Sequence, residues 1–282
     1  MKLFVGGARG GETVTDPAYC RYGGDTTSFW IAGAGGEQIV VDAGTGIGPI
    51  ARRMQADVPS ARALLLLFSH FHLDHMAGLP SFTPLYDPNW TVEMASRVFD
   101  DLTVEDVVSS FVAPPLWPLT LDELAAAKRF RILDGESMER PSQYGGLHVR
   151  WCVLHHPGGS TAFRIEEPAT GTSLVIATDV EWAEADEEHR AALKYLCATP
   201  QGADLLVFDG TCAPDNYEPY RGWGHSTWQE GIDLAQACGV KQLRITHHGS
   251  EMDDEACDAR NREIQSVWAA ASLARQGEEI EI

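Results

Sequence analysis

The sequence predicts a mixed α/β fold in which short buried strands alternate with helices. Apolar runs of three to eight residues recur along the chain, and most of them end at Gly, Asp or His. Between several of these runs lie amphipathic segments that begin or end with helix-capping residues. The chain has 282 residues, of which 44% are hydrophobic, so it can bury a sizeable core.

Nine apolar runs are expected to be strands: Leu3–Val5, Ser28–Ala32, Gln38–Asp42, Ala63–Phe68, Leu147–Leu154, Thr161–Ile165, Leu174–Ala177, Leu205–Phe208 and Gln242–Thr246. Three segments between them are expected to be helices: Pro49–Ala56, Asp186–Cys197 and Ser226–Cys238. The third helix has the clearest signals, because Ser226 and Gln229 fit a capping box and Gly239 follows its last turn. Polar side chains gather where the strands end, which is where sites on such scaffolds tend to form.

The segment from about residue 80 to about residue 133 differs from the rest of the chain. It combines six prolines with the aromatic residues Phe82, Tyr86, Trp90, Phe111 and Trp117. We expect an insertion of short helices and Pro-rich loops that lies over the cleft of the functional site. Its aromatic side chains either pack the insertion onto the body or contact a substrate. Because no linker or repeat divides the chain elsewhere, residues 1–282 are expected to form one domain.

The composition is strongly acidic, with 21 basic and 41 acidic residues and a net charge of −20. Proteins that bind long polyanions neutralise phosphates with clustered Lys and Arg. We therefore expect no extended nucleic acid as a partner. A small charged substrate remains compatible with this composition, because metal ions in a cleft create their own local field.

The six cysteines are scattered and contain no C-x-x-C pair, which is typical of a reduced, cytoplasmic protein. The apolar run at the N-terminus, Leu3–Val5, is too short for a signal peptide. No apolar stretch approaches the roughly 18 residues that a membrane span requires. We therefore expect a cytoplasmic protein without a membrane partner.

The strongest chemical signal lies directly after a run of five apolar residues. Three His and one Asp fall within six positions: His70, His72, Asp74 and His75. Imidazole nitrogens and carboxylate oxygens are good zinc ligands. Because these side chains are close in sequence, they can converge on one point with little loss of conformational entropy. Alternation along the turn lets His70 and His72 share one metal ion while Asp74 and His75 turn toward a second.

The pattern H-x-H-x-D-H resembles the metal-binding signature of the metallo-β-lactamase superfamily. The resemblance extends from about residue 5 to about residue 255. It implies a four-layer αββα sandwich and a hydrolytic centre built on two divalent metal ions. Zinc is the expected metal, and manganese or iron could occupy the same nitrogen and oxygen ligands.

The resemblance also implies a complete ligand set. The implied ligands are His70, His72 and His156 for one ion, Asp74, His75 and His247 for the other, and Asp179 as a bridge between them. Neighbours in a strand face opposite sides, so only one residue of the pair His155–His156 should reach the metals. The spacing of the chain does not decide which one, although His156 resembles the family ligand. In the second pair, His247 matches the last ligand of the family and His248 is the weaker candidate.

Three residues are assigned to supporting positions around these ligands. Asp42 ends a strand and matches an aspartate that supports the metal-binding loop in the superfamily, although it could also be an ordinary turn residue. His155 is expected either beside the ligands or in the core. His248 is expected beside His247.

The sequence Gly-His-Ser-Thr at Gly224–Thr227 resembles the phosphodiesterase and ribonuclease Z branch of the superfamily. In that branch the His contacts the scissile phosphate and can act as a general acid, which here would be His225. A His just before a helix lies near backbone N–H groups that favour anions. The alternative is a loop His that helps to cap the helix. Arg21–Thr26 and Asp209–Gly224 also resemble this branch, with Asp25 where Asn is usual.

These observations favour a phosphodiesterase that acts on a small or cyclic phosphodiester. A hydroxide between the metals would attack phosphorus, His225 would protonate the leaving group, and Asp74 could help to orient the nucleophile. Transfer-RNA processing is disfavoured, because no basic surface or flexible arm is evident. The alternatives are a lactone, thioester or β-lactam hydrolase on the same metals, or a metal-dependent nucleotide-binding sensor without turnover. A homodimer is compatible with the sequence.

Overall fold

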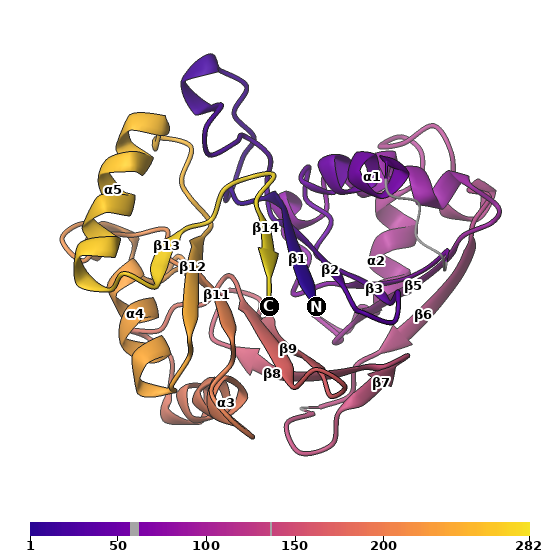
Figure 1. Ribbon diagram of the computed structural model, residues 1–282. Coiled ribbons are helices and arrows are strands. Elements are labelled where there is room, and N and C mark those ends of the chain that lie inside the picture. The colour runs from indigo at the N-terminus through magenta and orange to yellow at the C-terminus, as the bar shows by residue number, and fades with distance from the viewer. Residues whose placement is uncertain (57–61, 136) are drawn as a thin grey trace.

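The computed structural model describes residues 1–56, 62–135 and 137–282. The strands form two sheets of seven strands each, and helices cover the outer face of each sheet (Figure 1). Within the described ranges, none of the helices is long and apolar enough to cross a membrane.

The first sheet comes mainly from the N-terminal half of the chain. Its spatial order is β14 (Glu279–Glu281), β1 (Lys2–Gly7), β2 (Ser28–Ala32), β3 (Gln38–Val41), β4 (Ala63–Leu67), β5 (Thr91–Ser96) and β6 (Ala127–Ile132). Strands β3, β4, β5 and β6 are parallel to one another. Helices α1 (Ile47–Ala56) and α2 (Val104–Phe111) lie on the right in Figure 1, on the outer side of this sheet.

The second sheet mirrors this arrangement. Its order is β13 (Ala271–Leu273), β12 (Gln242–Thr246), β11 (Leu205–Asp209), β10 (Thr172–Ala177), β9 (Ser160–Glu167), β8 (Leu147–Leu154) and β7 (Ser142–Tyr144). Helices α3 (Glu187–Ala198), α4 (Trp228–Ala237) and α5 (Asp254–Val267) cover its outer face on the left in Figure 1. Strands β10, β11 and β12 are parallel, so their carboxyl ends meet at one edge.

Alternation along the strands sorts the apolar side chains into separate core layers. In β4, Leu65 and Leu67 belong to the cluster that packs between the two sheets. Leu64 and Leu66 point the other way and pack with residues of α1 and α2. On the other side, Val175 and Leu206 pack against the helices of the second sheet. The predicted four-layer αββα sandwich is confirmed.

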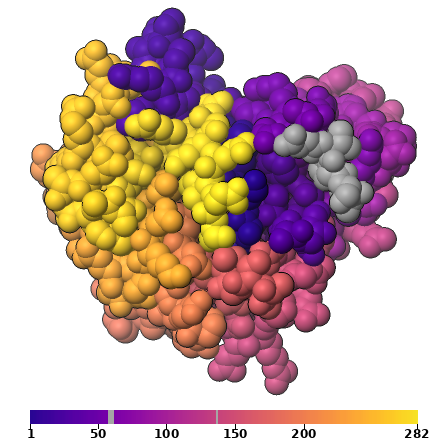
Figure 2. Space-filling view, in the orientation of Figure 1, coloured from indigo at the N-terminus to yellow at the C-terminus, as the bar shows by residue number. Residues whose placement is uncertain are grey.

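The C-terminal segment joins the two halves of the molecule. Strand β14 pairs antiparallel with β1, with Glu281 opposite Lys2. Figure 2 shows this segment in yellow, running between the orange half and the indigo-to-purple half of the surface. The two ends of the described chain are therefore held side by side, next to the core between the sheets.

Strands β5 and β6 correct the expectation for residues 80–133. All nine predicted strands are present, but this segment is not only short helices and Pro-rich loops, because β5 and β6 extend the first sheet. Glu93 interrupts the apolar residues of β5, and Lys and Arg interrupt those of β6, so both sequences lack the long apolar run of a central strand. The aromatic residues Phe82 and Trp90 are buried in the core under α1 and α2. None of the described residues of this segment lines the cavity beside the histidine cluster at residues 70–75.

The start of α4 also differs from the prediction. The N-cap is Thr227, whose hydroxyl accepts from the Glu230 amide while the Glu230 carboxylate accepts from the Thr227 amide. Ser226 and Gln229 therefore do not form the capping box. The Ser226 hydroxyl instead bonds the carbonyl of Val180 and accepts from the amide of Trp182. This contact ties the start of α4 to the end of β10.

Candidate metal centre and active site

The turn after β4 is shaped by a single buried carboxylate. Asp42 follows β3 with a left-handed φ of 62°, and its Oδ1 accepts from the Ser69 amide at 2.7 Å. Its Oδ2 accepts from the Ser69 hydroxyl at 2.8 Å and lies 2.9 Å from His75 Nδ1. The Ser69 hydroxyl in turn lies 3.0 Å from His70 Nδ1. Holding Nδ1 of both rings leaves Nε2 as the nitrogen available to a ligand.

Three more residues reach the same point from the carboxyl ends of strands in the second sheet. His156 follows β8, Asp179 follows β10 and His247 follows β12. Asp179 and His247 have left-handed φ values of 56° and 67°. Backbone strain of this kind concentrates at functional sites, because the surrounding structure must hold it in place. Parallel strands thus bring together residues that are up to 91 positions apart in the sequence, from His156 to His247.

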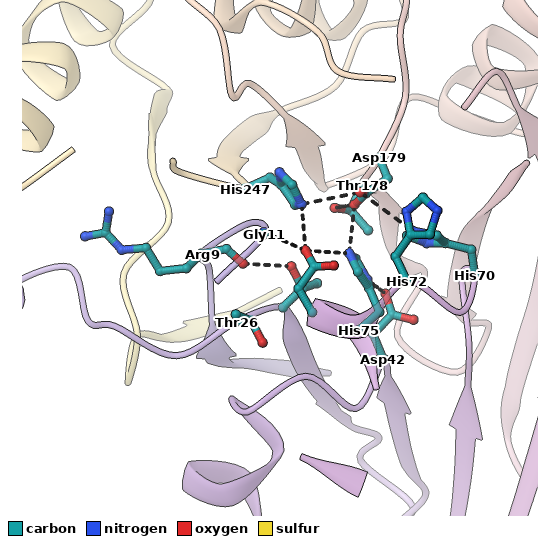
Figure 3. Close-up of polar contacts among 12 residues, drawn as sticks. Arg9, Gly11, Thr26, Asp42, His70, His72, His75, Thr178, Asp179 and His247 are labelled. Atoms are coloured by element: carbon teal, nitrogen blue, oxygen red, sulfur yellow. Dashed lines mark hydrogen bonds and ion pairs between the residues drawn. The ribbon is translucent and has the colours of Figure 1, made fainter. Parts of the chain in front are cut away.

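The ligand atoms of these residues form two neighbouring groups. His70, His72 and His156 form one, and Asp74, His75 and His247 form the other, each with its ligand atoms within 4.8 Å of one another. Asp179 lies between the groups (Figure 3). Its Oδ2 is 3.8 Å from Nε2 of His70 and of His156, and its Oδ1 is 3.1 Å from His75 Nε2.

The buried nitrogens of this cluster fit divalent cations. His70 Nε2 and His75 Nε2 are buried and lack an aligned hydrogen-bond partner, although Asp179 lies close to both. An unpaired buried polar atom is costly, so these atoms call for a ligand. Neutral imidazole and carboxylate donors at this density are the donor set that zinc, manganese or iron accept.

The electrostatics lead to the same interpretation. Burial lowers the pKa of His70 well below its usual value, so this ring is neutral. Burial opposes the charged form of Asp179, but His247 and His75 hold the pKa of its carboxyl well below the usual value. Burial also opposes a charge on His75, yet the neighbouring carboxylates, Asp179 foremost, raise its pKa well above the usual value. The pocket therefore requires positive charge, which divalent cations would provide.

His225 lies beside the ligands and is oriented by its own carboxylate. Its Nδ1 is 2.7 Å from Asp209 Oδ2, at the end of β11. Its ring stacks on His247 with centroids 4.5 Å apart. Burial alone would lower the pKa of His225, but Asp209, helped by Asp179, raises it to about 9. Because Asp209 holds Nδ1, Nε2 is the nitrogen that faces the cavity.

The N-terminal segment closes one side of the centre. The amide of Gly11 donates to Asp74 Oδ2 at 2.8 Å. A Cβ on Gly10 would lie 2.1 Å from atoms of the His247 ring, so only glycine permits this close approach. Gly10 and Gly11 were not among the predicted site residues, although the glycine-rich run at residues 6–11 is visible in the sequence.

A cavity of about 440 Å³ opens onto these residues. It is lined by Gly10, Gly11, Glu12, His72, Asp74, Asp179, Thr211, Cys212, Asn216, Tyr220, Trp223, His225, His247, Gly249, Ser250 and Glu251. A volume of this size is typical of small-molecule sites, roughly 300–1,000 Å³. Asn216, Tyr220 and Trp223 lie within Asp209–Gly224, whose resemblance to the ribonuclease Z branch assigned no role to these three side chains.

His155 and His248 lie apart from the two ligand groups. The His155 ring packs edge-on against His189, with centroids 6.1 Å apart. His248 is fully buried, and its Nε2 lies 2.9 Å from the carbonyl oxygen of Ala274. Neither residue belongs to a group of potential metal ligands among the described residues.

Comparison with known proteins places this geometry in context. Residues 37–248 match the family described as Beta-lactamase superfamily domain. Ribonuclease BN of Cronobacter sakazakii (strain ATCC BAA-894) is 34% identical, over 81% of this chain and 85% of that protein. Ribonuclease Z of Bradyrhizobium sp. (strain ORS 278) is 26% identical, over 86% of this chain and 89% of that protein. The fold resembles that of the short form of human tRNase Z, with a TM-score of 0.69 and 19% identity over 100% of this chain and 99% of that one.

These relatives correct one expectation from composition. The acidic net charge led us to expect no extended nucleic acid as a partner, and this expectation is overturned by relatives named ribonuclease Z and ribonuclease BN. The physical reason is that net charge sums the whole surface. Binding of a polyanion depends instead on the local field at the contact, to which bound cations contribute strongly.

Proposed function

The chain belongs to the β-lactamase superfamily, in its ribonuclease Z-like branch, and we propose that it is a dinuclear phosphodiesterase. The observation that carries the proposal is the convergence of seven nitrogen and oxygen ligands beside an eighth residue, His225, that its own carboxylate orients. One ion would be held by His70, His72 and His156, the other by Asp74, His75 and His247, with Asp179 shared between them. Two cations held in this way would activate a water molecule near neutral pH and offset the charge of a phosphate.

The residues of the chain supply orientation and proton handling. Asp209 fixes the His225 ring, so that Nε2 can donate a hydrogen bond to a phosphate oxygen and a proton to the leaving oxygen. Asp74 accepts from the Gly11 amide through Oδ2, which fixes its orientation between the ligands and the cavity. A carboxylate fixed in this way could also help to orient the attacking nucleophile.

The size of the cavity supports a substrate whose reacting part is small. A volume of about 440 Å³ accommodates a phosphate with one attached group such as a nucleoside. A short or cyclic phosphodiester and the end of an RNA chain both present such a group. We propose that the bond cleaved is a phosphodiester in either case.

A substrate panel tests the proposal. Purified protein loaded with zinc or manganese is assayed with bis(p-nitrophenyl) phosphate, a 3′-extended transfer RNA precursor, a homoserine lactone, a glutathione thioester and nitrocefin. We expect turnover of the phosphodiesters and its loss in His225→Ala with the metal content retained. Turnover of the lactone, thioester or β-lactam alone would contradict the proposal, and so would full activity in a chelated, metal-free preparation.

A further inference from the structure

An aromatic pair lies at the mouth of the cavity, in the loop that leads to His225. Tyr220 and Trp223 line the same cavity as Asp74 and Asp179. Their ring centroids are 5.4 Å apart and their planes meet at 87°. Trp223 is 63% exposed and Tyr220 is 40% exposed, whereas the other tryptophans are buried or half-buried. Exposed aromatic area beside a site usually serves binding.

A buried carboxylate holds the loop of this pair to the metal centre. Glu181 is 1% exposed and lies two residues after Asp179. Its Oε1 accepts from the Gly222 amide at 2.6 Å and from the Tyr217 hydroxyl at 2.6 Å. Its Oε2 accepts from the Gly224 amide at 2.9 Å. The backbone on both sides of Trp223 is therefore tied to the strand end that supplies Asp179.

The same loop also orients a ligand of the first group. The carbonyl oxygen of Gly224 lies 2.9 Å from His156 Nδ1. Gly224 has a φ of +94°, and a Cβ there would lie 2.1 Å from the same nitrogen. Because Gly224 packs closely against His156, the backbone of the loop cannot shift without moving this ring. The contact between Gly224 and His156 therefore sets the position of Trp223 relative to the ligands.

Arg221, the positively charged residue next to Tyr220 in the chain, contacts other residues of the protein. The guanidinium of Arg221 lies over the Tyr217 ring, 5.4 Å from its centroid, and forms ion pairs with Glu184 and Glu218. The Tyr220–Trp223 pair thus lines the cavity from a loop in which the side chains of Tyr217 and Arg221 are held by other contacts. A rigid aromatic surface binds a flat group with little loss of entropy.

We propose that Trp223, packed nearly perpendicular to Tyr220, is a stacking platform for the base of a nucleoside that is esterified to the scissile phosphate. This inference rests on the proposed phosphodiesterase function. Stacking of bases on aromatic side chains is the common recognition mode for unpaired nucleotides. Asn216 and Ser250 line the same cavity and offer polar groups to the edge of a base. Glu12 and Glu251 also line it, which makes a quaternary ammonium group the competing occupant.

Three chromogenic diesters that release the same p-nitrophenolate separate these possibilities. They are thymidine 5′-(p-nitrophenyl phosphate), methyl p-nitrophenyl phosphate and p-nitrophenyl phosphorylcholine. We expect Trp223→Ala to raise KM for the thymidine ester about tenfold and to leave the methyl ester within about twofold, because stacking strengthens binding of the base alone. Trp223→Phe should restore part of the loss. Tyr195→Ala is a control for the loss of an exposed aromatic side chain, because Tyr195 is 40% exposed, as Tyr220 is, but lies on α3, outside the residues that line the cavity.

Equilibrium binding provides a readout that does not need turnover. Isothermal titration with thymidine 5′-monophosphate should show Kd raised about tenfold in Trp223→Ala, whereas Kd for inorganic phosphate should not change. An equal change for both ligands, or a Trp223 dependence confined to the choline ester, would overturn the platform. Failure of the wild type to cleave any of the three esters would overturn the proposed function instead, and the titration would still decide the platform.

Discussion

The two halves of the molecule supply the candidate metal centre in different ways. The first sheet provides four ligands within one turn, His70 to His75, and one carboxylate, Asp42, braces that turn. The second sheet provides three ligands from three strand ends, and each has a different neighbour to orient it. His156 contacts the loop carbonyl of Gly224, for example, and His247 contacts the hydroxyl of Thr211.

The ligands of the first half are close together in the sequence, whereas those of the second half are far apart. The turn after β4 carries its four ligands within six positions, and Asp42 at the end of the adjacent strand β3 braces it, so it can form as a unit with that pair of strands. The strand ends of the second sheet meet only when β8, β10 and β12 have the correct register. We therefore expect substitutions in the first half to change metal affinity through their effect on the contacts of Asp42. Changes in the second half should separate into effects on metals, on His225 and on the loop of Trp223.

The largest effect is expected where the two halves meet, at Asp179. Asp179→Asn keeps the shape of the side chain but removes the charge that faces both ligand groups. We expect activity to fall by about 10³-fold, because cation binding supplies several kcal/mol of catalysis. Phosphodiesterase assays with metal analysis by mass spectrometry test this. Wild-type activity with a full metal content would show that the two groups do not need a shared carboxylate.

Removal of metal should affect the two halves of the molecule to different extents. Ligands that bind only the native state stabilise it, by about 4 kcal/mol at a thousandfold excess over Kd, so a chelator should lower Tm by on the order of 10 °C. Hydrogen exchange should then rise more at residues 247–249 than at residues 69–75, because Asp42 still braces the turn. Equal protection of both segments after chelation would contradict the comparison.

A matched pair of substitutions compares the two supporting carboxylates. Asp42→Asn should lower metal affinity about 10- to 100-fold, because the oxygen beside His75 Nδ1 loses its charge. Asp209→Asn should lower turnover by a similar factor while metals stay bound, because Asp209 contacts His225. Asn tolerates the left-handed backbone at position 42. Zinc titration and steady-state kinetics on both variants measure the two effects. Loss of metal in Asp209→Asn would contradict the expected difference between the two carboxylates.

The smallest effect is expected at the loop of the second half. Glu181→Gln removes the charge that two amides and a hydroxyl share, so we expect a loss of about 2 kcal/mol in the free energy of unfolding. Glu184→Gln is the control, because its ion pair with Arg221 is exposed to solvent and should contribute little to stability. Urea unfolding of both variants measures the difference. Equal stability losses would mean that Glu181 does not hold the loop.

Local patterns predicted much of the fold and of the ligand set. The continuous apolar run from Leu64 to Leu67 is typical of a strand buried on both faces, and the structure confirms that strand. The same patterns missed β5 and β6, whose charged residues hide their place in the sheet. They also assigned the start of α4 to Ser226, although the tertiary contact of Ser226 with Val180 frees Thr227 to cap the helix.

By itself, the sequence determined the chemical character of this protein: a turn dense in imidazole and carboxylate, and strands patterned for a core between two sheets. Only the tertiary structure decided the neighbours, such as Asp209 beside His225, Glu181 under the loop of Trp223, and His155 away from the ligands. The physical reason is range. Residue type and alternation act over a few positions, whereas these contacts join strand ends and loops that only the packing of the sheets brings within hydrogen-bonding distance.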